Sequence, residues 1–175
     1  MTRPFAIFCL LCATLLGGCS SPGPVQSQPR LVQKPGVFPL ALDDAFSFRK
    51  TKLFLHDLKL EKATTSDMIA FERERLNYRA VSWKETKARE GHYFDFWWRA
   101  QRRADVTLRL EYRQQNLGAY VQAQEVQVSG AKGTVETKFQ VTGDNYHDDG
   151  QVTCWRALLI ENGKVVALTQ SFLWN

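Results

Sequence analysis

The residues best suited to chemistry in this chain form a polar run at positions 143–150, which reads Gly-Asp-Asn-Tyr-His-Asp-Asp-Gly. Carboxylate oxygens are the hard ligands that calcium prefers, so Asp144, Asp148 and Asp149 are candidate metal ligands. Their spacing departs from the helix–loop–helix calcium pattern, which ends in a distant bidentate Glu. A zinc site at His147 would lack a second His or a usable Cys nearby in the sequence. Since Asp, Asn and Gly also dominate turns for conformational reasons, we expect a plain loop ahead of a metal site, and no cofactor.

Sequence motifs for catalysis are sparse. The histidines are His56, His92 and His147. The chain has no nucleophile-elbow Gly-x-Ser-x-Gly, no His-Glu-x-x-His and no phosphate-binding glycine loop. Adjacent carboxylates such as Asp148 and Asp149 point apart in an extended chain, so adjacency does not indicate an acid–base pair. We therefore expect a non-enzymatic protein, with a weak hydrolase that uses the 143–150 loop as an alternative.

Basic residues gather in the middle of the chain. Residues 73–113 hold eleven Lys and Arg against six Asp and Glu, and the formal net charge of the whole chain is +5. Arg99, Arg102 and Arg103 are expected to crowd a loop between two strands. Such a surface could bind anionic lipid, lipopolysaccharide or an acidic protein of the envelope. A solvated basic face that only keeps the domain soluble is the competing interpretation.

The amino terminus has the layout of a secretory signal. Arg3 precedes an apolar run at residues 5–16, which is too short for a comfortable transmembrane helix, and Leu16-Gly17-Gly18-Cys19 follows at once. These four residues resemble the lipobox of bacterial lipoproteins, a resemblance that covers only the first 20 residues. It implies that residues 1–18 are removed and that Cys19 becomes the lipidated first residue. Ser20 in place of Asp then implies an outer-membrane anchor. A plain signal peptide with an incidental Cys is the alternative.

Residues 19–36 are rich in Pro, Gly, Ser and Gln and are expected to form a flexible tether before a folded domain at 37–175. With Cys9 and Cys12 lost with the signal and Cys19 carrying lipid, Cys154 would be the one remaining thiol. We therefore expect no intramolecular disulfide in the mature chain, and a buried thiol at Cys154.

Apolar and polar residues alternate along much of the remaining sequence. The alternation is strict at residues 105–113, where Val106, Leu108, Leu110 and Tyr112 share one face and the charged residues the other. Further strands are expected at 52–61, with a bulge near 56–57, and at 76–81, 93–99, 120–128, 134–142, 151–160 and 165–174. A short helix is expected after Ser66. Asn162-Gly163 predicts a type I′ hairpin.

Seven or eight strands at spacings of about ten residues favour an all-β fold. We expect an immunoglobulin-like antiparallel β-sandwich, with a small barrel as the second choice. The sequence thus predicts a lipid-anchored envelope protein whose sandwich binds another envelope component. The alternative is a metal- or carbohydrate-binding module, or a weak hydrolase, that uses the 143–150 loop and an exposed Tyr146. The expected compartment disfavours nucleic acid as a partner.

Overall fold

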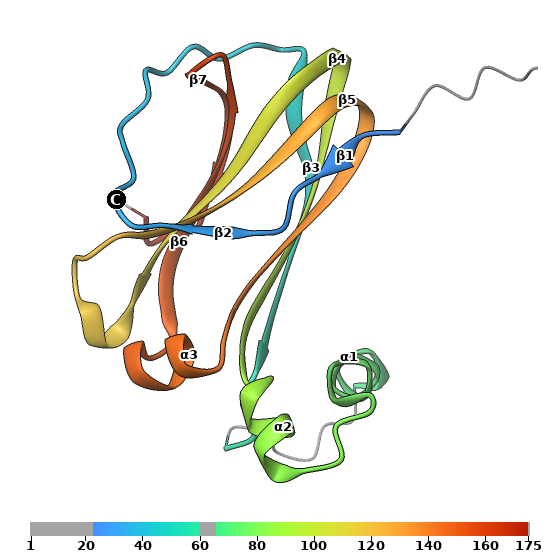
Figure 1. Cartoon of the computed structure of the whole chain (residues 1–175), viewed down its shortest axis with the longest axis vertical. Helices are drawn as coiled ribbons and strands as arrows, with labels where there is room; N and C mark the ends of the chain where they lie inside the picture. The colour runs from blue at the N-terminus through green and yellow to red at the C-terminus, as the bar shows by residue number, and fades with distance from the viewer. Residues whose placement is uncertain (1–22, 60–65, 175) are drawn as a thin grey trace, which may run out of the picture.

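The computed structural model describes residues 23–59 and 66–174, which form an antiparallel sheet of seven strands with short helices beside it (Figure 1). The strands are β1 Val25–Gln26, β2 Arg30–Val32, β3 Phe46–His56, β4 Gly91–Gln114, β5 Gln122–Thr142, β6 Val152–Glu161 and β7 Lys164–Gln170. The helices are α1 Asp67–Asn77, α2 Trp83–Ala88 and α3 Asp144–Asp149, with a 3₁₀ turn η1 at Gln115–Leu117. The expected all-β, sandwich-like class is confirmed.

The frame of the fold is the long hairpin of β4 and β5. On the edge that faces away from β5, β4 pairs with β3 along residues 91–100 and with β6 along residues 107–114. The pairing register of β4 shifts between Ala100 and Val106, where the sheet passes from one neighbour to the other. The two strands expected at 93–99 and 105–113 are therefore one strand. Arg99, Arg102 and Arg103 consequently lie on β4 itself, and the loop predicted for them is wrong.

The strand β5 also runs through an expected turn. Residues 120–128 and 134–142 were expected as separate strands, but β5 is continuous between them. Gly130 and Gly133 take φ values of +65° and +80°, a region that favours glycine, and they let β5 follow the irregularity in β4. The predicted hairpin after β6 is confirmed, because Asn162 and Gly163 both have positive φ, at 49° and 71°.

Aromatic side chains hold the two parts of the bent sheet together. Trp155 of β6 contacts Phe94 and Phe96 of β4, with ring centroids 6.1 and 5.6 Å apart. Phe96 also meets Phe139 of β5 edge to face at 6.1 Å. Trp98 is fully buried, and its indole N–H donates to Thr137 Oγ1 at 3.1 Å. Large aromatic rings bury the most apolar area per residue, so this cluster is the centre of the core.

The region before β4 differs from the expectation in three respects. The strand β3 begins at Phe46 and ends at His56, and its register shift lies between Phe48 and Lys50 rather than at 56–57. The helix after Ser66 is confirmed as α1, but it runs on to Asn77 and leaves no strand at 76–81. The charged stretch 84–91, whose sequence fits either a loop or a single helical turn, contains most of α2, which a Ser82–Glu85 capping box starts.

The expected tether is partly folded onto the sheet. Val25 pairs with Ser129 of β5, and residues 30–32 pair with residues 123–125 of the same strand. Residues 1–18 and Cys19 lie outside the described residues, so the signal peptide and the lipidation remain predictions. None of the helices within 23–59 and 66–174 has the length and apolar character needed to cross a membrane.

Candidate functional site: a groove with a charged floor

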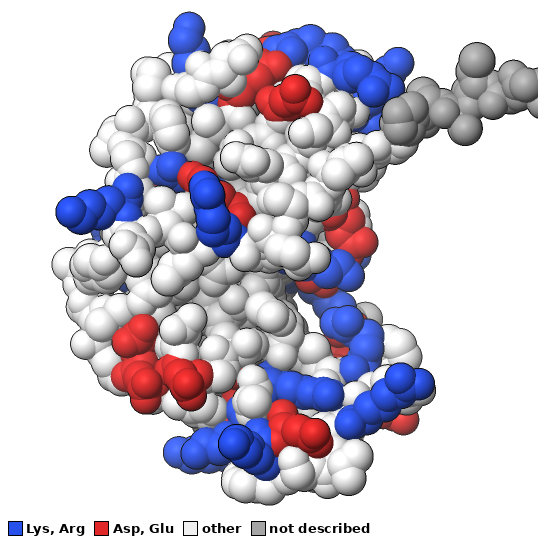
Figure 2. Space-filling model, in the orientation of Figure 1, with Lys and Arg blue, Asp and Glu red and all other residues white. Residues whose placement is uncertain are grey.

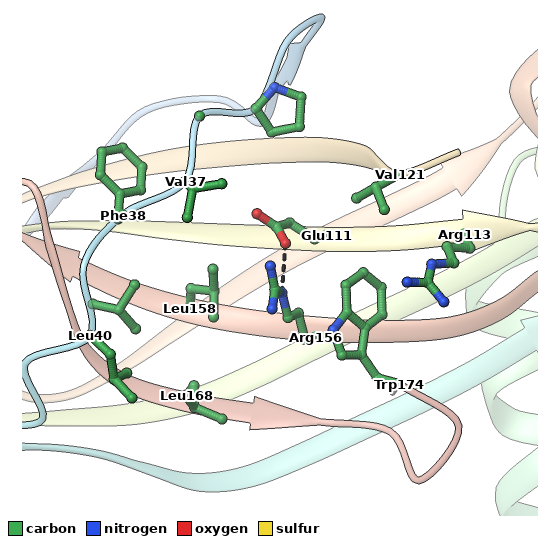
Figure 3. A pocket seen from close by; sticks show the side chains of 13 residues that line it. Val37, Phe38, Leu40, Glu111, Arg113, Val121, Arg156, Leu158, Leu168 and Trp174 are labelled. Atoms are coloured by element: carbon green, nitrogen blue, oxygen red, sulfur yellow. Dashed lines mark hydrogen bonds and ion pairs between the residues drawn. The ribbon is translucent and has the colours of Figure 1, made fainter. Parts of the chain in front are cut away.

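A cavity of about 570 Å³ opens on the sheet face that points away from the core, over β4, β6 and β7 (Figure 3). This is within the usual size range of ligand pockets. Its lining residues are Pro35, Gly36, Val37, Phe38, Leu40, Glu111, Arg113, Val121, Arg156, Leu158, Val165, Leu168 and Trp174. We call this cavity the groove, and we call residues 35–40, which run along one side of it, the strap. Apolar side chains from the strap, β6 and β7 make most of its wall.

The groove's floor comes from the charged face of β4. Leu108, Leu110 and Tyr112 point into the core, so the residues between them point outward. The sequence pattern predicts a wet face here, yet only 3% of Arg109 and 4% of Glu111 is exposed. The strap excludes water from these side chains because it folds across this part of the sheet, where Gly36 and Phe38 contact Arg109.

Arg109 fastens the strap to the sheet. Its guanidinium pairs with Glu125 of β5, Nη2 to Oε1, at 2.6 Å, and Nη1 donates to the Gly36 carbonyl at 2.7 Å. The same guanidinium lies 4.6 Å from the centre of the Phe38 ring. Hydrogen bonds to a buried cation are among the stronger ones in proteins. Arg109 is therefore a structural residue that holds one wall of the groove.

Glu111 occupies the centre of the floor and accepts from two arginines. The Nε of Arg156 donates to it at 2.6 Å, as Figure 3 shows, and Arg109 Nη1 lies 3.4 Å away. Arg156 also stacks on the Trp174 indole, 4.9 Å from the ring centre. With both of its oxygens bound in this way, Glu111 is committed to ion pairs within the protein rather than to proton transfer.

Arg113 is the one floor cation that meets no carboxylate within the described part of the chain. Its guanidinium lies over Trp174, 4.9 Å from the ring centre, and its Nε is buried without a hydrogen-bond partner. A buried donor without a partner costs free energy unless something supplies an acceptor. Among the residues that line the groove, two arginines (113 and 156) accompany one glutamate (111), so the floor carries one surplus positive charge at its Trp174 end.

The predicted metal ligands do not converge. Residues 143–150 form the helix α3 with its glycine caps instead of the expected loop. Asp149 accepts from Gln122 Nε2 at 3.0 Å, and the backbone carbonyl of Asp148 accepts from Asn116. Nowhere in residues 23–59 and 66–174 do three His, Cys, Asp or Glu side chains gather as metal ligands would. Asp144 lies in the first turn of α3 with no such cluster around it.

The aromatic residue expected to be exposed in this run is buried. Tyr146 is only 6% exposed, and its hydroxyl donates to Asp57 Oδ2 at 2.8 Å. Burial and this hydrogen bond raise the pKa of Tyr146. His147 is equally occupied, since its Nε2 lies 3.0 Å from the Lys87 carbonyl and 3.5 Å from Glu90. These contacts fasten α3 to β3 and α2, which is a structural role.

The three arginines predicted as a basic binding surface have different surroundings. Arg102 pairs with Glu161 and with Asp43, so its charge is balanced. The pKa of Asp43 is lowered, first by a hydrogen bond from the Ala45 backbone and then by Arg102. Arg99 and Arg103 are exposed, and neither has a carboxylate within ion-pair distance in the described part of the chain. Cys154 is buried, as expected, and forms no disulfide within the described part of the chain.

No protein-family model, curated protein or solved structure matches this chain, so the function has to be inferred from its own residues. Sequence reasoning missed the groove because its lining comes from six separate segments of the chain. The sequence signal that pointed toward it was the alternation of charge at 109, 111 and 113 opposite a fully apolar face.

Proposed function

We propose that the protein is a non-enzymatic, lipid-anchored component of the bacterial cell envelope that binds another envelope component in the groove. The lipobox resemblance at Cys19 supports the anchor and the outer membrane as the location. The groove supports the binding role. Its described lining contains no Ser, Cys, His or Lys, and its carboxylate Glu111 is held by arginines, so binding fits this site better than catalysis does.

The observation that best supports the binding role is that the buried Nε of Arg113 has no hydrogen-bond partner. An apolar wall of Val37, Phe38, Leu158 and Leu168 leads to a cation with a buried, unpartnered Nε. The partner that fits this site has an apolar part and an anionic group. Its apolar part would cover the apolar wall of the groove, and its anionic group would accept a hydrogen bond from Arg113 Nε. A hydrogen bond that involves a charged group contributes roughly 1.5–3 kcal/mol, which corresponds to about a tenfold to a hundredfold gain in affinity.

Site-specific photocrosslinking in intact cells tests this proposal. A benzophenone amino acid at position 168, in the groove wall, should form one reproducible adduct with an envelope molecule. Mass spectrometry of the adduct then distinguishes a lipid from a polypeptide. Leu168 is suitable because it lines the groove and is 41% exposed. The same amino acid at position 81 is the control, since Val81 is 93% exposed and lies outside the groove.

Arg113→Gln in the position-168 background should reduce the adduct about tenfold, because the surplus charge is removed. Lys84→Gln removes the same charge from an exposed site outside the groove and should leave the adduct unchanged. The proposal fails if position 168 gives no adduct beyond the level at position 81. It also fails if Arg113→Gln and Lys84→Gln have equal effects.

A further inference from the structure

The chain leaves the described domain at the bend of the sheet. Val25 of β1 is hydrogen-bonded beside Ser129 of β5, next to the irregular stretch at Gly130. Cys19 is six residues before Val25 in the sequence. Six residues span at most about 21 Å when fully extended. If Cys19 carries the lipid, as the proposed function requires, this end of the sheet is held within that distance of the membrane surface.

Basic side chains crowd the same end. The guanidinium of Arg103 reaches Gly130, since its Nη1 lies 3.2 Å from where a Cβ on that glycine would stand. Arg99 pairs in register with Thr134, and Lys132 lies between Gly130 and Thr134 on β5. All three are exposed, and we call them the basic bend. Figure 2 shows Lys and Arg gathered where the described chain begins.

The charges of the basic bend are not balanced within the protein. The neighbouring Arg102 is neutralised by Glu161 and Asp43, whereas Arg99, Arg103 and Lys132 have no ion pair among the described residues. Asp105 of β4 also lies here, and one of its oxygens accepts from the Gly130 backbone. The end of the domain closest to the anchor thus carries three exposed cations without an ion pair among the described residues.

We infer that the basic bend docks on the anionic headgroups of the membrane that holds Cys19, and so fixes the orientation of the domain. Basic residues close to an anionic surface each contribute a favourable electrostatic term that falls off within a Debye length. The linker permits this contact, because its fully extended length of about 21 Å is only about two Debye lengths. The docked domain directs α1 and α2, at the opposite end in Figure 1, away from the bilayer.

Depth-dependent quenching on the full lipidated chain tests the inference. The protein is reconstituted in nanodiscs of phosphatidylcholine, with or without about a third of phosphatidylglycerol, and with a trace of headgroup-nitroxide lipid. A fluorophore is placed at Ser129→Cys, beside the basic bend, or at Val81→Cys, at the far end. Native Cys154 is only 5% exposed and is protected from labelling. Anionic lipid should increase quenching at position 129 severalfold, high salt should reverse it, and position 81 should stay unquenched.

Charge variants identify the contact. Each of Arg99→Gln, Arg103→Gln and Lys132→Gln should lower the docking equilibrium about fivefold, and the triple variant about a hundredfold. Arg102→Gln is the matched control, because its charge is already balanced, and should change it less than twofold. Equal quenching at both positions, or no response to anionic lipid, would overturn the inference. Failure of the anchor is recognised separately, because the chain would not copurify with the nanodiscs, and Arg113→Gln tests the groove without altering docking.

Discussion

Replacement of Arg109 by Met tests the role assigned to the buried floor of the groove. The side chain of Arg109 is 4% exposed, and its loss leaves Glu125, which is 13% exposed, with only the exposed Arg30, whose Nη2 lies 3.7 Å from Glu125 Oε2. Removal of one partner from a buried ion pair costs roughly 3–5 kcal/mol, mainly because the other charge stays buried and unpaired. For a domain of this size, we expect the melting temperature to fall by roughly 6–20 °C.

The matched control for this change is Arg102→Met. Arg102 also binds two carboxylates, but its side chain is 49% exposed, so solvent screens its ion pairs and its replacement should change stability little. Urea denaturation of both variants measures the difference directly. Adding Glu125→Gln to Arg109→Met removes the stranded charge and should restore about 1–2 kcal/mol.

A second measurement on Arg109→Met follows from its bond to the Gly36 carbonyl. Without this bond, backbone amides of the strap should exchange with deuterium faster than in the native protein, and the increase should exceed that in the neighbouring strand β6. The reasoning would be refuted if Arg109→Met and Arg102→Met lowered stability equally, or if strap exchange were unchanged.

Three further predictions concern other parts of the chain. Burial lowers the pKa of His92 from 6.5 to about 4, and its neutral Nε2 accepts a hydrogen bond from Val152 N–H. Between these two pH values the unfolded state binds more protons than the folded state, so the free energy of unfolding should fall by up to about 3 kcal/mol as the pH drops from 6.5 to 4. Urea titrations of His92→Gln should lack this decline. Gly91 has φ of 149°, and a Cβ would stand 2.0 Å from the Val141 carbonyl oxygen, so Gly91→Ala should lose at least about 2 kcal/mol in the same assay, whereas Gly23→Ala, with open space around it, should be neutral. Cys19→Ala should release the protein from membranes or leave it uncleaved, and unchanged fractionation and mass would contradict lipidation.

The strand pattern was readable from the sequence because one face of each strand is apolar. Val106, Leu108, Leu110 and Tyr112 alternate with polar residues, and all four are core residues in the structure. The Asn162-Gly163 turn was equally clear, since few residue pairs favour two successive positive φ values. Both features depend on residues close together in the chain, which sequence patterns record well.

The features that the sequence did not reveal depend on contacts between distant segments. The outward face of β4 reads as a solvent face, and only the strap from residues 35–40 makes it a buried floor. The break between 99 and 105 reads as a loop, but pairing with β5 resumes at Ala104 and Val106 after register shifts and keeps the segment within one strand. Residues 25–32 have the composition of a linker, yet backbone hydrogen bonds to β5, which any sequence can make, order them.

The pairing of β1 and β2 with β5 has a mechanical consequence for an anchored protein. A force applied at residue 19 reaches β1 first, and strands of two and three residues detach one hydrogen bond at a time. Their detachment from Val25 up to the strap, which Arg109 fastens at Gly36, would free residues 25–34, and these 10 residues add roughly 35 Å of contour length while β3–β7 stay intact. Detachment of β1 and β2 would therefore lengthen the linker under tension without unfolding the rest of the domain. Single-molecule stretching from residue 19 should show an extension step of about this size before the domain unfolds.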